Sequence, residues 1–157
     1  MKKLSSDFFE SFYCLYDCNL PSYTKSLIRQ LSAHNIPLVL DCGSWKDNIL
    51  SLNYADVAIS SEKFASPESN DIFVLKKDFQ IKCVAQTRGG DNIIFYDELE
   101  KGEIEVTKLD NVNTLGAGDV LHGAFCHYFF DCEEDFNVAL SHASEFATDF
   151  IRNSSRE

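Results

Sequence analysis

The stretch "IPLVLD" (Ile36–Asp41) predicts a β-strand that is buried on both faces, because four of its six residues are large and aliphatic. One-sided strands alternate apolar and polar residues, whereas parallel strands covered by helices on both sides are apolar throughout. The run ends in a carboxylate, Asp41, where such a strand meets its loop. Ala55–Ser60 and Ile81–Thr87 repeat the pattern, and each also ends in a polar residue. Together the three runs indicate a parallel sheet.

The segments around these runs alternate between strand and helix patterns. Ser22–Asn35, for example, carries its aliphatic residues at helical spacing. The other predicted elements are a strand at Ser11–Asp17, an antiparallel hairpin of Asn92–Asp97 and Glu103–Leu109, and helices at Asp119–Phe130 and Glu133–Asn153. Strands that alternate with helices build an α/β domain with a layered, mostly parallel sheet. Since the chain has no repeat, low-complexity tract or long linker, we expect residues 1–157 to form one domain.

The composition limits the classes of partner. The chain has 157 residues, of which 45% are hydrophobic and 25% are charged, and these proportions are ordinary for a globular protein. The net charge of −11 disfavours nucleic acid and anionic membrane surfaces, because both would repel the protein. No apolar run approaches the roughly 20 residues that span a bilayer, and the N-terminal stretch lacks a signal-peptide pattern. We therefore expect a cytoplasmic protein.

The spacing of cysteines and histidines favours neither a disulfide framework nor a metal site. No pair of the six cysteines has C-x-x-C spacing, and most lie inside apolar runs, so we expect them to be small buried hydrophobic residues. His122 and His127 flank Cys126, but they lie five residues apart and therefore on different helix faces. This arrangement disfavours a metal site there.

The segment "NTLGAGDVLHGAF" (Asn113–Phe125) has the composition of an anion site at a helix start. The first N–H groups of a helix have no partner within the helix and carry partial positive charge. Because Gly116, Ala117 and Gly118 have little or no side chain, an anion can approach their amides closely. Asp119 follows them, where it can accept a proton from a hydroxyl that attacks a phosphoryl group. The alternative is structural: an acidic residue that favours a helix start after a glycine-rich turn.

Four segments of the chain, in order, resemble the ribokinase-like (PfkB) carbohydrate kinases, and in particular a bacterial sugar-kinase branch. They are "VLDCGSWKD", "ADVAISSEKFA", "VAQTRGGDNIIFYD" and "NTLGAGDVLHGAF", the last of which is similar to the family motif D-T-x-G-A-G-D. The resemblance implies a ribokinase-like, Rossmann-type layered sheet. It also implies transfer of the γ-phosphoryl group of ATP, with Mg²⁺, to a hydroxyl of a sugar or sugar-like molecule. The chain contains neither G-x-x-x-x-G-K-[ST] nor G-x-G-x-x-G, so neither a P-loop nor an NAD-type oxidoreductase is indicated.

The resemblance also implies roles for individual residues. Asp119 would be the catalytic base, and the amides of Gly116–Gly118 would form an anion hole for the transferring phosphoryl group. The other implied site residues are Thr87 and Gly89 along the ATP phosphates and ribose, Asp41 near the phosphates or their Mg²⁺, and Thr114 in the turn that presents the anion hole. Capping of strand ends is the structural alternative for Asp41 and Thr87.

The sequence departs from the family pattern in ways that leave a second function open. Asn113 replaces the first aspartate of the motif, and Ser61–Phe64 replaces an N-x-x-E motif associated with Mg²⁺ and phosphate. The resemblance covers the C-terminal half of these kinases, which are roughly twice as long, so we expect an incomplete sheet with an uncovered edge. A homodimer or a complementary N-terminal half would cover that edge. The alternative function is a non-catalytic module that binds a nucleotide or a partner.

Overall fold

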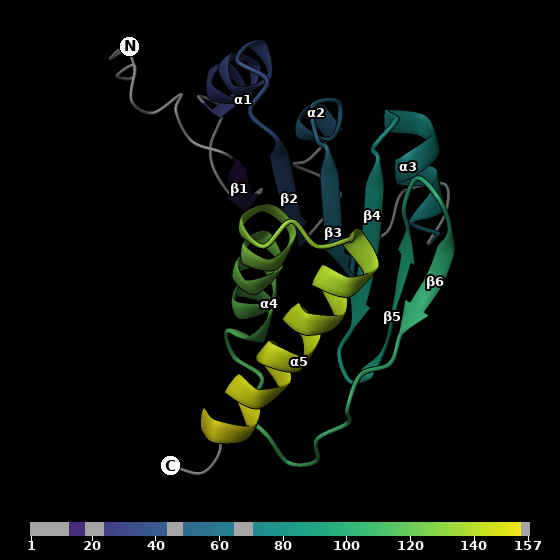
Figure 1. Ribbon diagram of the computed structural model, residues 1–157, viewed down its shortest axis with the longest axis vertical. Coiled ribbons are helices and arrows are strands. Elements are labelled where there is room, and N and C mark those ends of the chain that lie inside the picture. The colour runs from purple at the N-terminus through teal and green to yellow at the C-terminus, as the bar shows by residue number, and fades with distance from the viewer. Residues whose placement is uncertain (1–12, 18–23, 44–48, 65–70, 155–157) are drawn as a thin grey trace.

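The computed structural model describes residues 13–17, 24–43, 49–64 and 71–154. Its elements in chain order are β1 (Cys14–Asp17), α1 (Thr24–Ala33), β2 (Leu38–Cys42), α2 (Ile49–Leu52), β3 (Val57–Ser61), α3 (Phe73–Phe79), β4 (Cys83–Arg88), β5 (Asp91–Tyr96), β6 (Lys101–Ile104), α4 (Ala117–Cys126), a π-helical turn η2 (His127–Asp131) and α5 (Phe136–Ser154). The six strands form one sheet in the order β1-β2-β3-β4-β5-β6 (Figure 1). The predicted α/β architecture is confirmed.

Strand direction follows the apolar runs. β1, β2, β3 and β4 pair in parallel, whereas β5 pairs antiparallel with β4 and with β6. The predicted hairpin is confirmed as β5 and β6, and a tight turn at Gly89 also joins β4 to β5. Gly89 has a φ of +62°, a left-handed conformation that glycine adopts without strain. The sheet is therefore mostly parallel with an antiparallel end.

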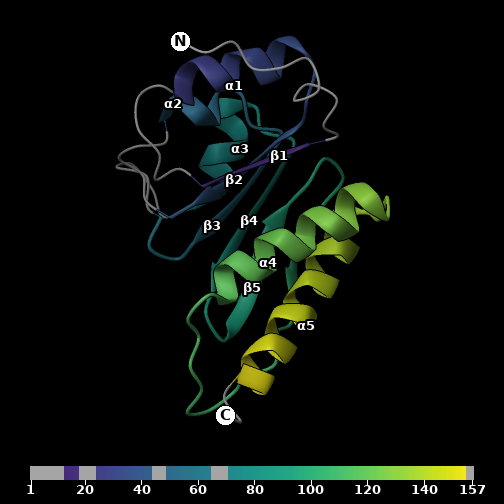
Figure 2. The ribbon, with the colours of Figure 1, turned by 90° about the vertical axis from the view of Figure 1, so that its left-hand side faces the viewer.

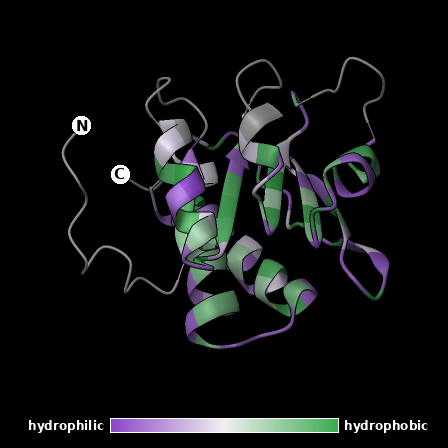
Figure 3. Ribbon diagram, turned by 90° about the horizontal axis from the view of Figure 1, so that it is seen from above, coloured by the Kyte–Doolittle hydropathy of each residue, from purple (hydrophilic) through white to green (hydrophobic). Residues whose placement is uncertain are grey.

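Helices cover both faces of this sheet. Figure 2 shows α1, α2 and α3 on one side of the strands, and α4 and α5 on the other. Neighbouring residues of β2 point to opposite sides, so the buried Leu38 and Leu40 join the core beside α1, while the buried Val39 joins the core beside α4 and α5. Figure 3 shows hydrophobic residues concentrated on the strands between the two helical layers. Burial on both faces explains why the strand sequences are apolar without alternation.

Several element boundaries differ from the sequence prediction. β6 begins at Lys101, inside the predicted loop, and ends at Ile104, earlier than predicted. The cause is local, because the Asp97 carboxylate accepts two backbone amides of the turn and closes the hairpin early. α4 begins at Ala117 and not at Asp119. The short helices α2 and α3 contain too few turns for a periodic pattern, and the sequence does not predict them.

The cysteines are mostly small buried hydrophobic residues, as predicted. Cys42, Cys83 and Cys126 are buried, and burial raises the pKa of the Cys126 thiol to about 12. Cys132 is exposed, because it follows the π-helical turn at the end of the helix, so the prediction is wrong for that residue. Cys18 lies outside the described residues. Within the described ranges, no helix is long and apolar enough to cross a bilayer.

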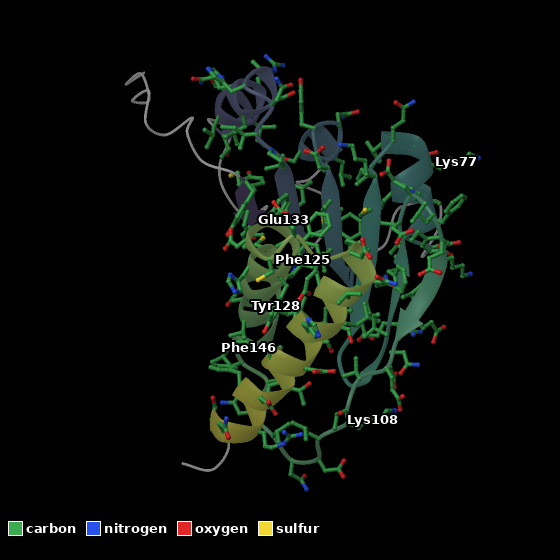
Figure 4. The ribbon with its side chains drawn as sticks, viewed as in Figure 1. Lys77, Lys108, Phe125, Tyr128, Glu133 and Phe146 are labelled. Carbon is green, nitrogen blue, oxygen red and sulfur yellow. The ribbon has the colours of Figure 1, made fainter. Side chains whose placement is uncertain are left out.

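The core beside α4 and α5 depends on Phe125, which is 0% exposed and has its ring centroid 5.5 Å from that of Phe136. We expect Phe125→Ala to lower the free energy of unfolding by about 3–5 kcal/mol, because it leaves a cavity in this core. Phe146 on α5 is the matched control: it is 54% exposed, and Phe146→Ala should cost no more than about 0.5 kcal/mol (Figure 4 shows both side chains). Urea unfolding measures both variants, and equal losses would contradict this view of the core.

Candidate functional site

The polar ends of the parallel strands meet at one edge of the sheet. Asp17 of β1 is in register with Asp41 of β2, and Ser61 of β3 is in register with Thr87 of β4. Figure 2 shows α4 beginning at this edge. The charges of Asp17 and Asp119 both act on Asp41, so each of these two carboxylates lies within electrostatic reach of Asp41. The strand ends that carry Asp17, Asp41, Ser61 and Thr87 thus share one edge with the start of α4, and we call this edge the rim.

The turn before α4 is built by local hydrogen bonds. The side-chain oxygen of Asn113 accepts a backbone amide two residues on at 3.0 Å, and the Thr114 carbonyl accepts the amide of Ala117 at 3.1 Å. Gly116 then takes a φ of +80°, which a residue with a side chain reaches only with strain. Its carbonyl accepts the first helical hydrogen bond, from Val120 at 3.0 Å. Backbone geometry therefore requires Gly116, and Thr114 closes the turn that presents the helix start.

Some of the amides at this helix start are open. Because Ala117 donates to Thr114, the prediction that all three amides of Gly116–Gly118 are free is wrong for Ala117. Within the described part of the chain, the amides of Gly116, Gly118 and Asp119 donate to no protein acceptor. A Cβ atom added to Gly118 would meet no atom within 4 Å, so this residue faces open space. The helix start can therefore bind an anion on the amides of Gly118 and Asp119.

Two carboxylates near these amides have different surroundings. Asp119 is exposed, whereas the Asp41 side chain is only 25% exposed. The Oδ2 atom of Asp41 is 3.5 Å from Nδ1 of His122. Burial raises the pKa of Asp41 above its ordinary value of 3.8; His122 opposes this rise, and the charges of Asp17 and Asp119 add to it. Asp119 is thus the carboxylate that can meet a molecule from solvent, while Asp41 is partly enclosed.

The hydroxyls at the ends of β3 and β4 are used within the sheet. Ser60 is buried and donates to the carbonyl of Ala85 at 3.2 Å, and Thr87 donates to the carbonyl of Ser60 at 3.3 Å. The structural alternative, strand-end capping, therefore accounts for the Thr87 hydroxyl, and the β4–β5 turn accounts for Gly89. A role for Thr87 and Gly89 beside a nucleotide stays a prediction.

A hollow of about 570 Å³ lies between the segment that starts in β6 and the C-terminal half of α5. Thr107 and Ser141 contribute hydroxyls to its lining, and Glu103, Asp149 and Arg152 contribute charges. Figure 1 shows that β6 runs from there into the segment that leads to α4. The segment after β6 thus connects the lining of the hollow to the start of α4.

The sequence does not predict two features of this site. His122 forms the buried face of α4 together with Leu121, Phe125 and Cys126. A polar residue among buried apolar ones needs hydrogen-bond partners, and this is the signal by which the sequence could have marked it. The hollow has no local signal, because its walls come from two segments far apart in the chain. Among the described residues, no three His, Cys, Asp or Glu side chains form a group that could hold a metal ion.

The fold is shared with kinases of the ribokinase family. Comparison of the sequence with protein-family models and with curated proteins gives no match. Among solved structures, ribokinase from Thermotoga maritima is similar with a TM-score of 0.75 and 21% identity, over 92% of this chain and 52% of that one. A carbohydrate kinase from Agrobacterium tumefaciens has a TM-score of 0.70 and 20% identity, over 90% and 48%. A pyrophosphate-dependent kinase in the ribokinase family has a TM-score of 0.63 and 17% identity, over 82% and 52%.

These similarities establish the architecture of this chain, a mostly parallel sheet between helical layers. The chain spans about half the length of each of the three structures.

Replacement of Asp41 tests whether its negative charge lowers the free energy of unfolding. The raised pKa means that the folded protein still holds a proton at pH values just above 3.8, where the unfolded chain has lost it. The free energy of unfolding of the wild type therefore falls as the pH rises through this window. We expect Asp41→Asn to unfold at a higher temperature than the wild type near neutral pH, with the difference shrinking on acidification.

Thermal unfolding followed by circular dichroism from about pH 3 to about pH 7 measures this difference. Asp110→Asn, at an exposed position in the segment before α4, is the control and should change little. An Asp41→Asn variant that is less stable than the wild type near neutral pH would show that the Asp41 carboxylate stabilises the fold.

Proposed function

We propose that this chain carries the phosphoryl-donor site and the catalytic base of an ATP-dependent sugar kinase. The observation that supports the proposal is the combination of open amides at Gly118 and Asp119 with the exposed carboxylate of Asp119, on a fold shared with ribokinase-family kinases. The reaction transfers the γ-phosphoryl group of ATP to a hydroxyl of a sugar or sugar-like molecule. One helix turn then supplies both needs of this reaction, hydrogen bonds for the developing charge and an acceptor for the proton.

In this mechanism Asp119 accepts the proton of the attacking hydroxyl while the hydroxyl oxygen bonds to the γ-phosphorus. The bond between that phosphorus and the β–γ bridging oxygen breaks, and ADP leaves with the electron pair. The amides of Gly118 and Asp119 donate to phosphoryl oxygens on which negative charge develops, and the partial positive charge of the helix start adds to their effect. Gly116 contributes by holding the turn in the left-handed conformation that exposes these amides.

The acidic rim sets a condition on the donor. Because Asp17 and Asp119 both act electrostatically on Asp41, this edge is negative and would repel free ATP. Mg²⁺ fits this site as a companion of the donor phosphates, since no group of three possible ligands exists among the described residues to hold it as a resident ion. Mg²⁺ on the phosphates would offset part of their charge. Magnesium-ATP is therefore the donor form that we propose.

The hollow beside α5 favours a donor that carries a base over pyrophosphate. Carboxylates such as Glu103 and Asp149 make its lining unsuitable for phosphates, whereas the hydroxyls of Thr107 and Ser141 can hydrogen-bond to the edge of a base. We propose that the nucleoside end of the donor lies there and the phosphates reach toward α4. Equal affinity for magnesium-pyrophosphate and magnesium-ATP would count against this placement.

A second function, binding without catalysis, is compatible with the same site. About half of each similar kinase structure has no counterpart here, and no residue of this chain has been assigned to the sugar. A chain that binds the donor without turnover would be a nucleotide-binding or partner-binding module, which acts through a homodimer or a complementary N-terminal half. Donor binding by calorimetry, together with a coupled assay of ADP release on a panel of sugars, separates the two functions.

Asp119→Asn tests the base. The amide cannot accept the hydroxyl proton, so we expect the kcat for phosphoryl transfer to fall about 10²–10⁴-fold while the affinity for magnesium-ATP is retained. The ADP-release assay gives kcat, and calorimetry gives the affinity. Asp110→Asn is the matched control and should leave both values unchanged. Unaltered turnover in Asp119→Asn would remove Asp119 from the mechanism.

Gly118→Asp tests the anion site. A new side chain at Gly118 meets no protein atom within 4 Å, and an acidic residue is favourable in the first turn of a helix, so the fold should be retained. The added negative charge stands beside the open amides, and we expect affinity for magnesium-ATP to fall at least about 10-fold. Calorimetry measures the affinity, and thermal unfolding checks the fold. Gly118→Ala, which adds bulk without charge, should lose less affinity; equal binding by Gly118→Asp and the wild type would contradict the anion site.

A further inference from the structure

The imidazole of His122 lies at the junction of three elements. Its Nδ1 atom is 2.7 Å from the carbonyl oxygen of Gly118 on α4 and 3.5 Å from Oδ2 of Asp41 on β2. Its Nε2 atom is 3.4 Å from the carbonyl oxygen of Ile59 on β3. The residue is 6% exposed, so water cannot replace these partners freely. One buried ring thus connects the first turn of α4 to β2 and β3.

The chemistry of the partners decides where the ring carries a proton. A peptide carbonyl can only accept, so the 2.7 Å contact with Gly118 requires a proton on Nδ1. The carboxylate of Asp41 lies beside the same N–H, and the partial positive charge of this hydrogen stabilises the negative charge of the carboxylate. Nε2 also faces an acceptor, the carbonyl of Ile59, and a second proton there would satisfy that contact as well. All three neighbours therefore favour a ring that donates.

We propose that His122 is a positioning residue, which ties the carboxylate of Asp41 to the first turn of α4 and so sets its distance from the open amides of that turn. Asp41 can face the α4 layer at all because the alternation along β2 turns it to the same side as the buried Val39. Gly118, whose carbonyl the ring binds, is also the residue whose amide is open. His122 therefore connects two parts of the rim without facing solvent itself.

The consequence for the donor rests on the proposed function. Asp17, Asp41 and Asp119 all bring negative charge to this rim, and phosphates tolerate a nearby carboxylate only if its position is controlled. If the contact with His122 is lost, the Asp41 carboxylate is free to turn toward the anion site, where its charge repels the donor phosphates. Donor affinity should then fall even though His122 touches no donor atom.

The tether itself can be tested without any donor. Nitrogen-detected NMR of the histidine rings in the full chain, assigned through His122→Asn, reports which ring nitrogen carries a proton. We expect a protonated Nδ1 in the wild type and a clear change in the His122 ring resonances in Asp41→Asn. An Nδ1 without a proton would overturn the proposed link between His122 and Asp41. His122 ring resonances that are the same in Asp41→Asn and the wild type would overturn it as well.

The effect on the donor is measured by calorimetry with magnesium-ATP on single and double variants. We expect His122→Leu to weaken binding about 10-fold, because the Asp41 carboxylate loses the ring N–H that lies 3.5 Å from it. His122→Asn keeps an N–H near the place of Nδ1 and should recover part of this loss. The double variant Asp41→Asn/His122→Leu should bind no more weakly than Asp41→Asn alone, because His122 acts through Asp41.

Controls separate positioning from a loss of structure. His127→Leu makes the same replacement at the exposed histidine that follows α4, and it should leave donor binding unchanged. Thermal unfolding identifies variants that fail to fold, and His122→Asn keeps the test valid if His122→Leu is one of them. Additive effects of His122→Leu and Asp41→Asn, or no effect of either histidine variant on affinity, would overturn the positioning role. Absence of donor binding in the wild type would overturn the proposed function and its consequence here, whereas the ring resonances would still decide the tether.

Discussion

β2, β3 and β4 are buried on both faces, and this double burial determines where the molecule can place a polar side chain. Leu38 and Leu40 point to one helical layer and Val39 to the other, so a polar group has room only at a strand end. Parallel strands end at the same edge, and Asp17 and Asp41 therefore come together there. The helix that covers the second face begins at that edge, and its open amides lie beside the carboxylates.

The rim combines carboxylates with a backbone dipole, and their relative strength decides what can bind. A helix start carries about half an elementary positive charge, which is less than the charge of the neighbouring carboxylates. The charges of Asp17 and Asp119 act on Asp41, and among the groups that influence Asp41 only His122 favours the ionised form. The amides can orient a phosphoryl group, but a cation on the donor has to supply most of the attraction. A protein with a net charge of −11 would otherwise repel a polyphosphate.

The described residues account for one side of the proposed transfer reaction. The open amides and the exposed carboxylate suit the donor and the proton, and the hollow beside α5 suits a base. The acceptor side has no comparable set of residues assigned to it, and about half of each similar kinase structure has no counterpart in this chain. The described rim therefore suits the donor side of the proposed kinase reaction, and it would also suit a module that binds the donor without turnover.

Features that depend on neighbours in the sequence could be predicted from it. The apolar runs predict the parallel strands because double burial leaves no alternation, and the glycines before Asp119 predict an open helix start because a turn there needs a residue with positive φ. The tertiary structure alone decided that the Ser60 hydroxyl is buried and that the ring of His122 meets Asp41 and Ile59. Residues 41, 59 and 122 are far apart in the chain, and only the packing of α4 against β2 and β3 brings them together. A local sequence pattern predicts whether a segment is a helix or a strand and which turn follows it. Contacts between elements depend on how their faces pack, which no local pattern contains.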